Sequence, residues 1–106
     1  MVRELSEREL RAFVKENPIC VVYLWGPQCS PCRLVTPIVE KLSEEIDVPF
    51  GKVNVSDYPD VVWDYAVLAL PSVLVFRDGE IADRIAGAKP EKAYRLRIQE
   101  AIDAGK

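Results

Sequence analysis

The chain has 106 residues and a formal net charge of −3 at pH 7, with 49% hydrophobic and 29% charged residues. This balance is typical of one globular domain, expected to span residues 1–106, and the acidic excess argues against a nucleic-acid partner. No apolar run approaches the roughly 20 residues of a membrane span, and the absence of histidine excludes Cys–His proteases, Cys/His zinc fingers and haem attachment through C-x-x-C-H.

Hydrophobic periodicity predicts strands and helices that alternate along the chain. Ser6 predicts a helix N-cap that closes a capping box with Glu9, and the continuous apolar run 19–25 is typical of a strand covered on both faces. Pro37 lies inside a helical pattern and is expected to kink that helix. In chain order we expect a strand at 2–5, a helix from Ser6 to Asn17, a strand at 19–25, a helix at 31–46, a strand at 50–55, a helix at 58–65, strands at 72–76 and 81–86, and a helix at 91–104.

The last third of the chain predicts a hairpin. Asp78 and Gly79 stand between the strands at 72–76 and 81–86, and an Asp-Gly pair is a strong signal for a two-residue turn. Strands that alternate with helices favour parallel pairing through crossovers, whereas a hairpin adds antiparallel strands to the same sheet. The expected fold class is therefore α/β, a sandwich with a central mixed sheet that ends in a β-hairpin and a helix.

The segment Cys29-Ser30-Pro31-Cys32 places two thiols three positions apart at the start of a helical pattern. The unpaired amide groups and the positive dipole end of a helix favour a thiolate on Cys29, and Pro31 suits the first helical turn. Two thiols at this spacing can close a small disulfide and open it again. The segment therefore predicts a redox site.

Metal binding is the main alternative for this cysteine pair. A structural zinc site needs four ligands, and the sequence offers Cys20 as the one further thiol. We therefore predict no metal site, although an iron–sulfur cluster that bridges two copies of the chain stays open as an alternative. Cys20 itself is expected to be a small buried hydrophobe early in a strand.

Beyond the cysteine pair, several segments resemble the thioredoxin family in their order and separation. Residues 25–33 are similar to the family's tryptophan-led segment, which ends in Cys-Gly-Pro-Cys-Lys. Pro37 stands where the family has its helix-kinking proline, and residues 70–72 resemble the loop whose cis proline faces the cysteines. Residues 78–79 and Gly87 match the family's hairpin and final-strand glycines. The resemblance covers almost the whole chain and implies a thioredoxin-like three-layer α/β/α sandwich.

The resemblance also implies roles for the residues of the site. Cys29 is expected to be the nucleophile that attacks a target disulfide, and Cys32 the resolving thiol that releases the reduced target. Pro31 is expected to act with them at the start of the helix, and the Leu70–Pro71 peptide bond is expected to be cis. Target binding is expected at Trp25, Gln28, Leu70, Pro71 and Gly87.

Three positions depart from the family pattern. Gln28 replaces a tryptophan before the first cysteine, and Ser30 replaces the glycine within the motif. Tyr23 replaces the buried aspartate that is held to exchange protons with the second cysteine, whereas Lys52 keeps the place of the lysine that accompanies it. A phenol is a poor proton acceptor at neutral pH, so three explanations stay open. Lys52 tunes Cys32 by its charge if the two groups lie within a few ångströms, water carries the proton, or Tyr23 only fills the space. In each case we expect resolution by Cys32 to be slower than with a carboxylate present. The substitution Tyr23→Asp is expected to speed turnover.

Together these features predict an enzyme, a thioredoxin-like oxidoreductase that reduces protein disulfides without a cofactor and contributes to cell redox homeostasis. By the resemblance, a thioredoxin-reductase-type partner recharges a monomeric chain. The N-terminus carries no apolar signal segment, so a cytoplasmic location is expected. Three alternatives stay open: an oxidant or isomerase, a binding or chaperone-like module with weak redox activity, and a glutathione-using enzyme.

Overall fold

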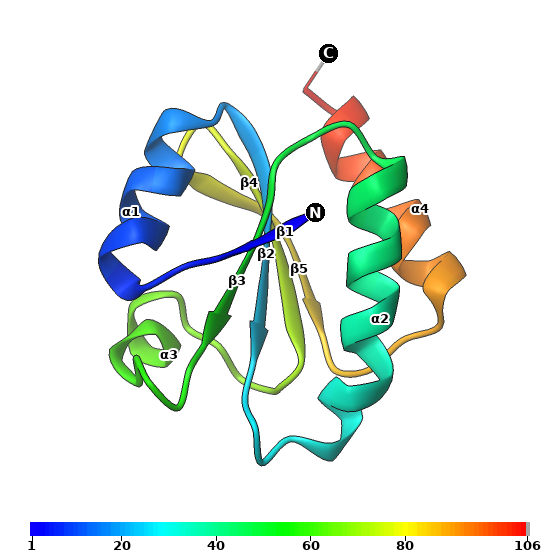
Figure 1. Cartoon of the computed structure of the whole chain (residues 1–106). Helices are drawn as coiled ribbons and strands as arrows, with labels where there is room; N and C mark the ends of the chain where they lie inside the picture. The colour runs from blue at the N-terminus through cyan, green and yellow to red at the C-terminus, as the bar shows by residue number, and fades with distance from the viewer. Residues whose placement is uncertain (106) are drawn as a thin grey trace.

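Five strands form one sheet with helices packed on both of its faces (Figure 1), across the residues 1–105 that the computed structural model describes. The strands are β1 (Val2–Glu4), β2 (Ile19–Trp25), β3 (Phe50–Asn54), β4 (Ser72–Arg77) and β5 (Glu80–Ala86). The helices are α1 (Glu7–Glu16), α2 (Ser30–Glu45), α3 (Asp60–Asp64) and α4 (Glu91–Asp103). Within these residues, no helix is both long enough and apolar enough to cross a bilayer.

The sheet combines parallel and antiparallel strands in the order β1-β3-β2-β4-β5. The strands β1, β3 and β2 run parallel, and β4 runs antiparallel to both β2 and β5. The mixed sheet predicted from the sequence is therefore confirmed. Because β2 is the central strand, the segment that follows it emerges at the middle of one end of the sheet.

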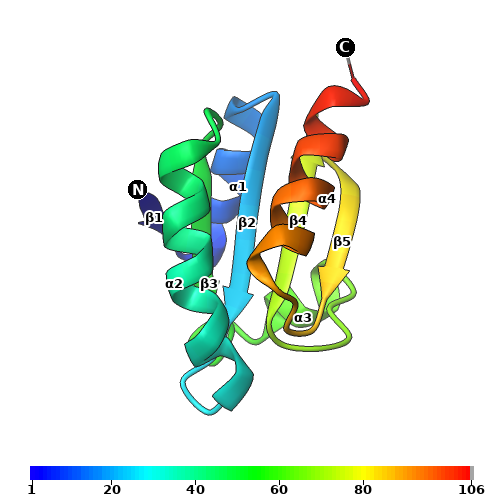
Figure 2. The same ribbon diagram turned by 90° about the vertical axis from the view of Figure 1, so that its right-hand side faces the viewer.

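The helices form two outer layers. Helices α1 and α3 cover one face of the sheet, and α2 and α4 lie side by side over the other face (Figure 1 and Figure 2). The strand β2 serves both layers because successive side chains of a strand alternate between faces. Val22 and Leu24 belong to the core under α1, whereas Val21 and Tyr23 belong to the core under α2 and α4. All four are buried, which explains the unbroken apolar run of this strand.

Two local sequence signals are confirmed in the backbone. Ser6 Oγ accepts the N–H of Glu9 at 3.1 Å, and Glu9 Oε1 accepts the N–H of Ser6 at 3.0 Å, which completes the capping box of α1. Asp78 and Gly79 both have positive φ angles, 52° and 83°, as a type I′ hairpin turn requires. These local interactions set where α1 begins and where β4 turns into β5.

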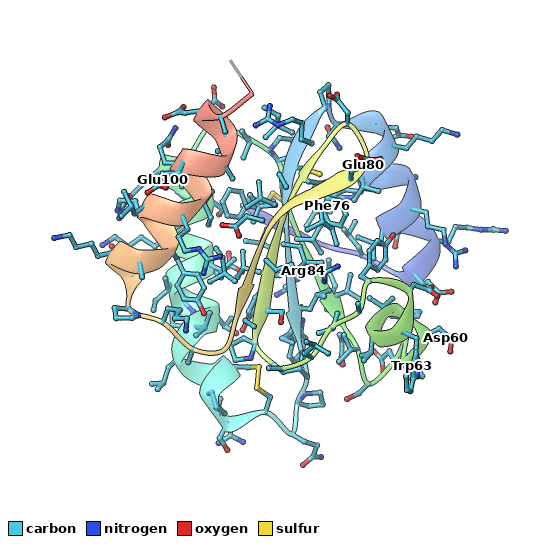
Figure 3. All side chains as sticks on the ribbon, turned by 180° about the vertical axis from the view of Figure 1, so that it is seen from behind. Asp60, Trp63, Phe76, Glu80, Arg84 and Glu100 are labelled. Atoms are coloured by element: carbon cyan, nitrogen blue, oxygen red, sulfur yellow. A yellow bond between two sulfur atoms is a disulfide. The ribbon has the colours of Figure 1, made fainter. Side chains whose placement is uncertain are left out.

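Helix α2 begins at Ser30, one residue before the predicted start, so Pro31 occupies the second helical position instead of the first. Proline is tolerated there because the amide groups of a first helical turn have no intrahelical acceptor. Pro37 lies inside the helix, as the sequence predicts. Both motif cysteines consequently lie at the start of α2, beyond the end of β2, and the disulfide between them is seen at that end of the sheet in Figure 3.

Candidate active site

Cys29 is the N-cap residue of α2, and its sulfur is bonded to the sulfur of Cys32. The two Cα atoms are 5.3 Å apart, and Cys29 Sγ also accepts the backbone N–H of Cys32 at 3.2 Å. That amide and the positive end of the helix dipole would stabilise a thiolate on Cys29 after reduction. Cys29 is half-buried, whereas Cys32 is only 2% exposed. A partner molecule therefore meets the Cys29 sulfur first.

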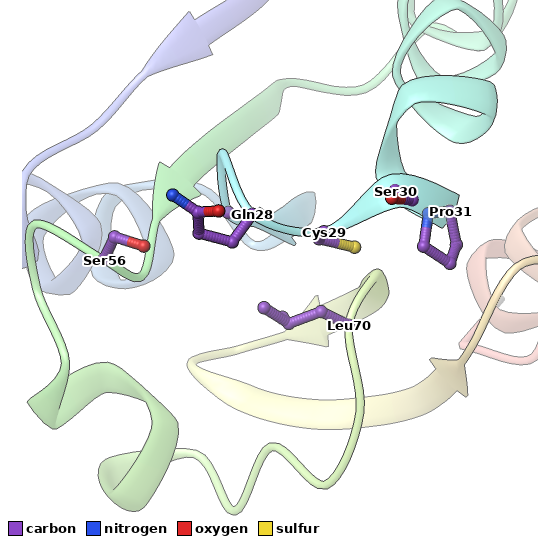
Figure 4. A pocket seen from close by; sticks show the side chains of 7 residues that line it. Gln28, Cys29, Ser30, Pro31, Ser56 and Leu70 are labelled. Carbon is purple, nitrogen blue, oxygen red and sulfur yellow. The ribbon is translucent and has the colours of Figure 1, made fainter.

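An open pocket of about 490 Å³ lies beside the disulfide. Cys29 and Leu70 face each other across it, and Gln28 and Ser56 lie to one side (Figure 4). The pocket is lined by Gly26, Gln28, Cys29, Ser30, Pro31, Ser56 and Leu70. The wall around the reactive sulfur thus mixes apolar surface with an amide and two hydroxyl groups.

The loop that faces the disulfide is fixed by its own hydrogen bonds. The Leu70–Pro71 peptide bond is cis, which is the geometry that the resemblance to the thioredoxin family implies. The N–H of Gly87 donates to the carbonyl of Pro71 at 2.8 Å, and Tyr94 donates its hydroxyl to the carbonyl of Gly87 at 2.8 Å. Pro71 and Tyr94 are buried, so this loop is held against the sheet while Leu70 stays half-exposed in the pocket.

Tyr23 lies behind the cysteine pair and is 1% exposed. Its hydroxyl donates to the carbonyl oxygen of Cys32 at 3.1 Å and lies 2.9 Å from Thr36 Oγ1, which also donates to that carbonyl at 2.9 Å. Burial raises the pKa of the Tyr23 phenol, with a smaller opposite effect from the Thr36 hydrogen bond. The residue that replaces the family's acid is therefore a neutral hydroxyl.

Three residues of this site were not predicted from the sequence: Ser56 in the pocket lining, Tyr94 beside the cis-proline loop and Thr36 behind the cysteine pair. Thr36 is the most informative of them. A signal for it exists, because threonine inside a helix often bonds its hydroxyl to the carbonyl four residues earlier, and here that carbonyl belongs to Cys32. Its second contact, with Tyr23, depends on how α2 packs on β2 and has no sequence signature.

Lys52 lies directly opposite Tyr23 in the β2–β3 register. Its ammonium group is 3.9 Å from a carboxylate oxygen of Glu40 on α2. Glu40 lies eight residues after Cys32, or about 12 Å along the helix axis. The positive charge of Lys52 therefore has a carboxylate partner further along α2, and its tuning of Cys32 stays a prediction.

Trp25 and Gln28, two of the residues expected to bind targets, differ strongly in exposure. Trp25 is half-buried and packs against the core under α2, and within residues 1–105 its indole Nε1 is the buried side-chain donor that lacks an acceptor. Gln28 is exposed on the pocket rim. Trp63 is 83% exposed on α3 (Figure 3) and lies outside the core.

Cys20 is separated from the disulfide by the sheet. Its side chain is 0% exposed and belongs to the core under α1, on the face opposite α2. Burial raises the pKa of this thiol to about 11. In the described part of the chain, no cluster of three or more Cys, Asp or Glu side chains is placed to hold a metal ion.

We predict that Cys20 resists alkylation in the folded, reduced protein, because a buried thiol with a pKa near 11 is ionised in about one molecule per thousand at pH 8. Iodoacetamide at about pH 8, followed by peptide mapping, should modify Cys29 at least about a hundredfold faster than Cys20. Denaturant should abolish the difference. Equal rates in the folded protein would contradict this prediction.

Comparison with known sequences gives the family. The Thioredoxin family model matches residues 1–100. The chain belongs to the thioredoxin family. The thioredoxin of Pyropia yezoensis is 32% identical to it over 95% of this chain and 97% of that protein. The thioredoxin of Chlamydia caviae is also 32% identical, over 84% of this chain and 87% of that protein.

Solved thioredoxins share the fold described above. The oxidized form of mitochondrial thioredoxin 3 from Saccharomyces cerevisiae is 29% identical, with a TM-score of 0.85 over 93% of this chain and 94% of that chain. A mutant thioredoxin from Halobacterium salinarum is 25% identical, with a TM-score of 0.85 over 94% of this chain and 88% of that chain. This member of the thioredoxin family is therefore a protein-disulfide oxidoreductase, and Cys29 and Cys32 are its Cys-x-x-Cys pair.

Proposed function

We propose that this protein reduces disulfide bonds in protein substrates, with Cys29 as the attacking thiol and Cys32 as the resolving thiol. The observation that carries the proposal is the unequal exposure of the two sulfur-bearing residues at the start of α2. A target can approach Cys29 from the pocket, whereas Cys32 can react only with a sulfur already bound to the protein. Thiol–disulfide exchange needs this order, in which one thiol first binds the target and a second thiol then releases it.

The cycle begins with the reduced dithiol. The Cys29 thiolate attacks one sulfur of the target disulfide, the target S–S bond breaks, and the released target thiolate takes a proton from water. The Cys32 thiol then gives its proton to solvent, and its thiolate attacks the Cys29 sulfur of the mixed disulfide. The bond to the target breaks, the second target thiolate leaves, and the Cys29–Cys32 disulfide forms. Two electrons pass from the protein dithiol to the target, which ends as two thiols.

We propose that targets bind along the pocket between Cys29 and the cis-proline loop. Leu70 faces the disulfide there (Figure 4), and the backbone of this loop can pair with an extended target segment by strand addition. Gln28 and Ser56 make the rim more polar than a tryptophan at position 28 would. We therefore expect preferred targets to carry polar side chains beside the reacting cysteine. Trp25 and Gly87 would support this surface from beneath and beside it.

The oxidised protein needs a reductant, and we propose a thioredoxin-reductase-type partner. One structural neighbour, 28% identical with a TM-score of 0.84, comes from a structure on the thiol resolving mechanism of yeast mitochondrial 1-Cys peroxiredoxin via glutathione/thioredoxin systems. This supports peroxide-oxidised thiol proteins as one class of target. We further propose that the chain is a single domain and acts as a monomer. We place it in the cytoplasm, because dithiols persist in reducing compartments.

The reduction potential of the Cys29–Cys32 pair tests the proposed direction of electron flow. We expect a two-electron couple near −270 mV, the level of a thioredoxin reductant, when the protein equilibrates with defined thiol–disulfide buffers. A value above roughly −200 mV would contradict the reductant role and support an oxidant or isomerase. The absence of any two-electron couple would support a binding module instead.

A further inference from the structure

Two hydroxyl groups converge on one backbone oxygen behind the active-site disulfide. The carbonyl oxygen of Cys32 accepts the hydroxyl of Tyr23 at 3.1 Å and the hydroxyl of Thr36 at 2.9 Å, and the two hydroxyl oxygens are 2.9 Å apart. The three oxygens form a closed triangle that contains two protons and no formal charge. We call the two side chains of this triangle the hydroxyl clamp.

The clamp joins two different elements of the fold. Tyr23 belongs to β2 and lies opposite Lys52 and Val73 in the sheet, so its backbone is held between both neighbouring strands. Thr36 belongs to α2, one turn after Cys32. The clamp therefore ties the first turn of α2 to the central strand, through the backbone of the resolving cysteine itself.

The surrounding helix explains why such a tie is needed. Pro37 follows Thr36 and has no N–H, so the carbonyl of Arg33 loses the donor that a regular helix would supply four residues later. The first turn of α2 is therefore held less firmly by its own backbone ladder. The two hydroxyl groups donate to the adjacent carbonyl, that of Cys32, and so add hydrogen bonds beside the position where the ladder lacks one.

We propose that Tyr23 and Thr36 are positioning residues that hold Cys32 for its attack on the mixed disulfide. This inference rests on the proposed function. While the target is bound to Cys29, the Cys29–Cys32 bond is broken, and the position of Cys32 then depends on its backbone and on the packing around its buried side chain. A fixed carbonyl keeps the Cys32 sulfur near the Cys29 sulfur, and close placement of two reacting atoms accelerates their reaction.

The hydroxyl clamp positions the Cys32 sulfur and does not accept the Cys32 proton. Burial raises the pKa of the Tyr23 phenol, so this group stays protonated at and around neutral pH. The proton of Cys32 leaves to solvent, as in the cycle above. The clamp should therefore affect the second step of the cycle and leave the first step, the attack by Cys29, unchanged.

The test measures the two steps separately by stopped-flow absorbance with dithiobis(nitrobenzoate). Each reduced protein releases one coloured thiolate when Cys29 attacks and a second when Cys32 resolves the adduct. We expect Tyr23→Phe and Thr36→Val each to slow the second release about fivefold, the order that one neutral hydrogen bond supports. The rate of the first release should stay within about twofold of wild type. Thr36→Ser should restore the second rate.

Two further variants make the result specific. In the double variant Tyr23→Phe/Thr36→Val, the second step should slow by less than the product of the single effects, because the two hydroxyls act as one unit. Ser43→Ala is the matched control, since Ser43 donates its hydroxyl to the carbonyl of Glu40 at 2.6 Å near the other end of α2. This variant should resolve at the wild-type rate.

Three outcomes would overturn the clamp. In the first outcome, Tyr23→Phe and Thr36→Val are folded by circular dichroism and still release the second thiolate at the wild-type rate. The hydroxyl clamp would then have no role in positioning Cys32. Equal slowing of both steps would indicate general damage to the site and no positioning of Cys32. A wild-type protein that releases one thiolate and never a second would overturn the proposed function, and this inference with it.

Discussion

Cys29→Ser is expected to lower protein-disulfide reduction by at least about a thousandfold, because removing an attacking nucleophile typically costs that much or more. Cys29 is the half-exposed cysteine beside the pocket, and the buried Cys32 cannot take over its role against a bulky target. The measurement is the rate of insulin disulfide reduction with dithiothreitol as the reductant. Activity unaffected by this substitution would contradict the oxidoreductase mechanism.

The other two cysteines supply the controls for this experiment. Cys32→Ser should react once and then stop, so a covalent adduct of protein and target should accumulate and be visible by mass spectrometry. Cys20→Ala should retain the wild-type rate, since its thiol is buried in the core under α1. Loss of activity in Cys20→Ala without loss of folding would assign that thiol a role that the fold does not explain.

Most of the fold could be predicted because its signals are local. The capping box of Ser6 and Glu9, the apolar run of β2 and the Asp-Gly turn each depend on a few neighbouring residues. Element boundaries were less predictable, as the start of α2 at Ser30 shows. The order of the strands in the sheet follows from long-range pairing, so the sequence predicted a mixed sheet without its strand order.

The active site also combines features that short sequence motifs predict with features that depend on long-range packing. The cysteine pair lies in a short motif that the sequence displays, whereas the cis bond before Pro71 is expected only from the resemblance to the thioredoxin family. The contacts of Tyr23 depend on how α2 sits on the sheet, and Thr36 was missed for that reason. Lys52 is expected from the resemblance alone, and its ion pair with Glu40 depends on where α2 packs on the sheet.

Tyr23→Asp is expected to destabilise the protein while accelerating the resolving step. Replacing a fully buried aromatic ring by a small side chain typically lowers the free energy of unfolding by about 3 to 5 kcal/mol. The loss of the Tyr23 hydroxyl alone would slow resolution about fivefold. A carboxylate that accepts the Cys32 proton, directly or through a water in the vacated space, contributes about a hundredfold or more. The base therefore outweighs the lost hydrogen bonds.

The measurement is the rate of the second thiolate release in Tyr23→Asp, divided by the folded fraction that urea unfolding curves give. Tyr23→Asn is the matched control variant. Asparagine has the shape of aspartate and opens the same space, but it cannot accept a proton at neutral pH. We expect the aspartate variant to resolve at least about tenfold faster than wild type and the asparagine variant to be slower than wild type. Equal rates in the two variants would show that the vacated space, and no carboxylate, governs the step. A rate for Tyr23→Asp at or below wild type would mean that positioning of Cys32 by the native hydroxyls outweighs a proton acceptor.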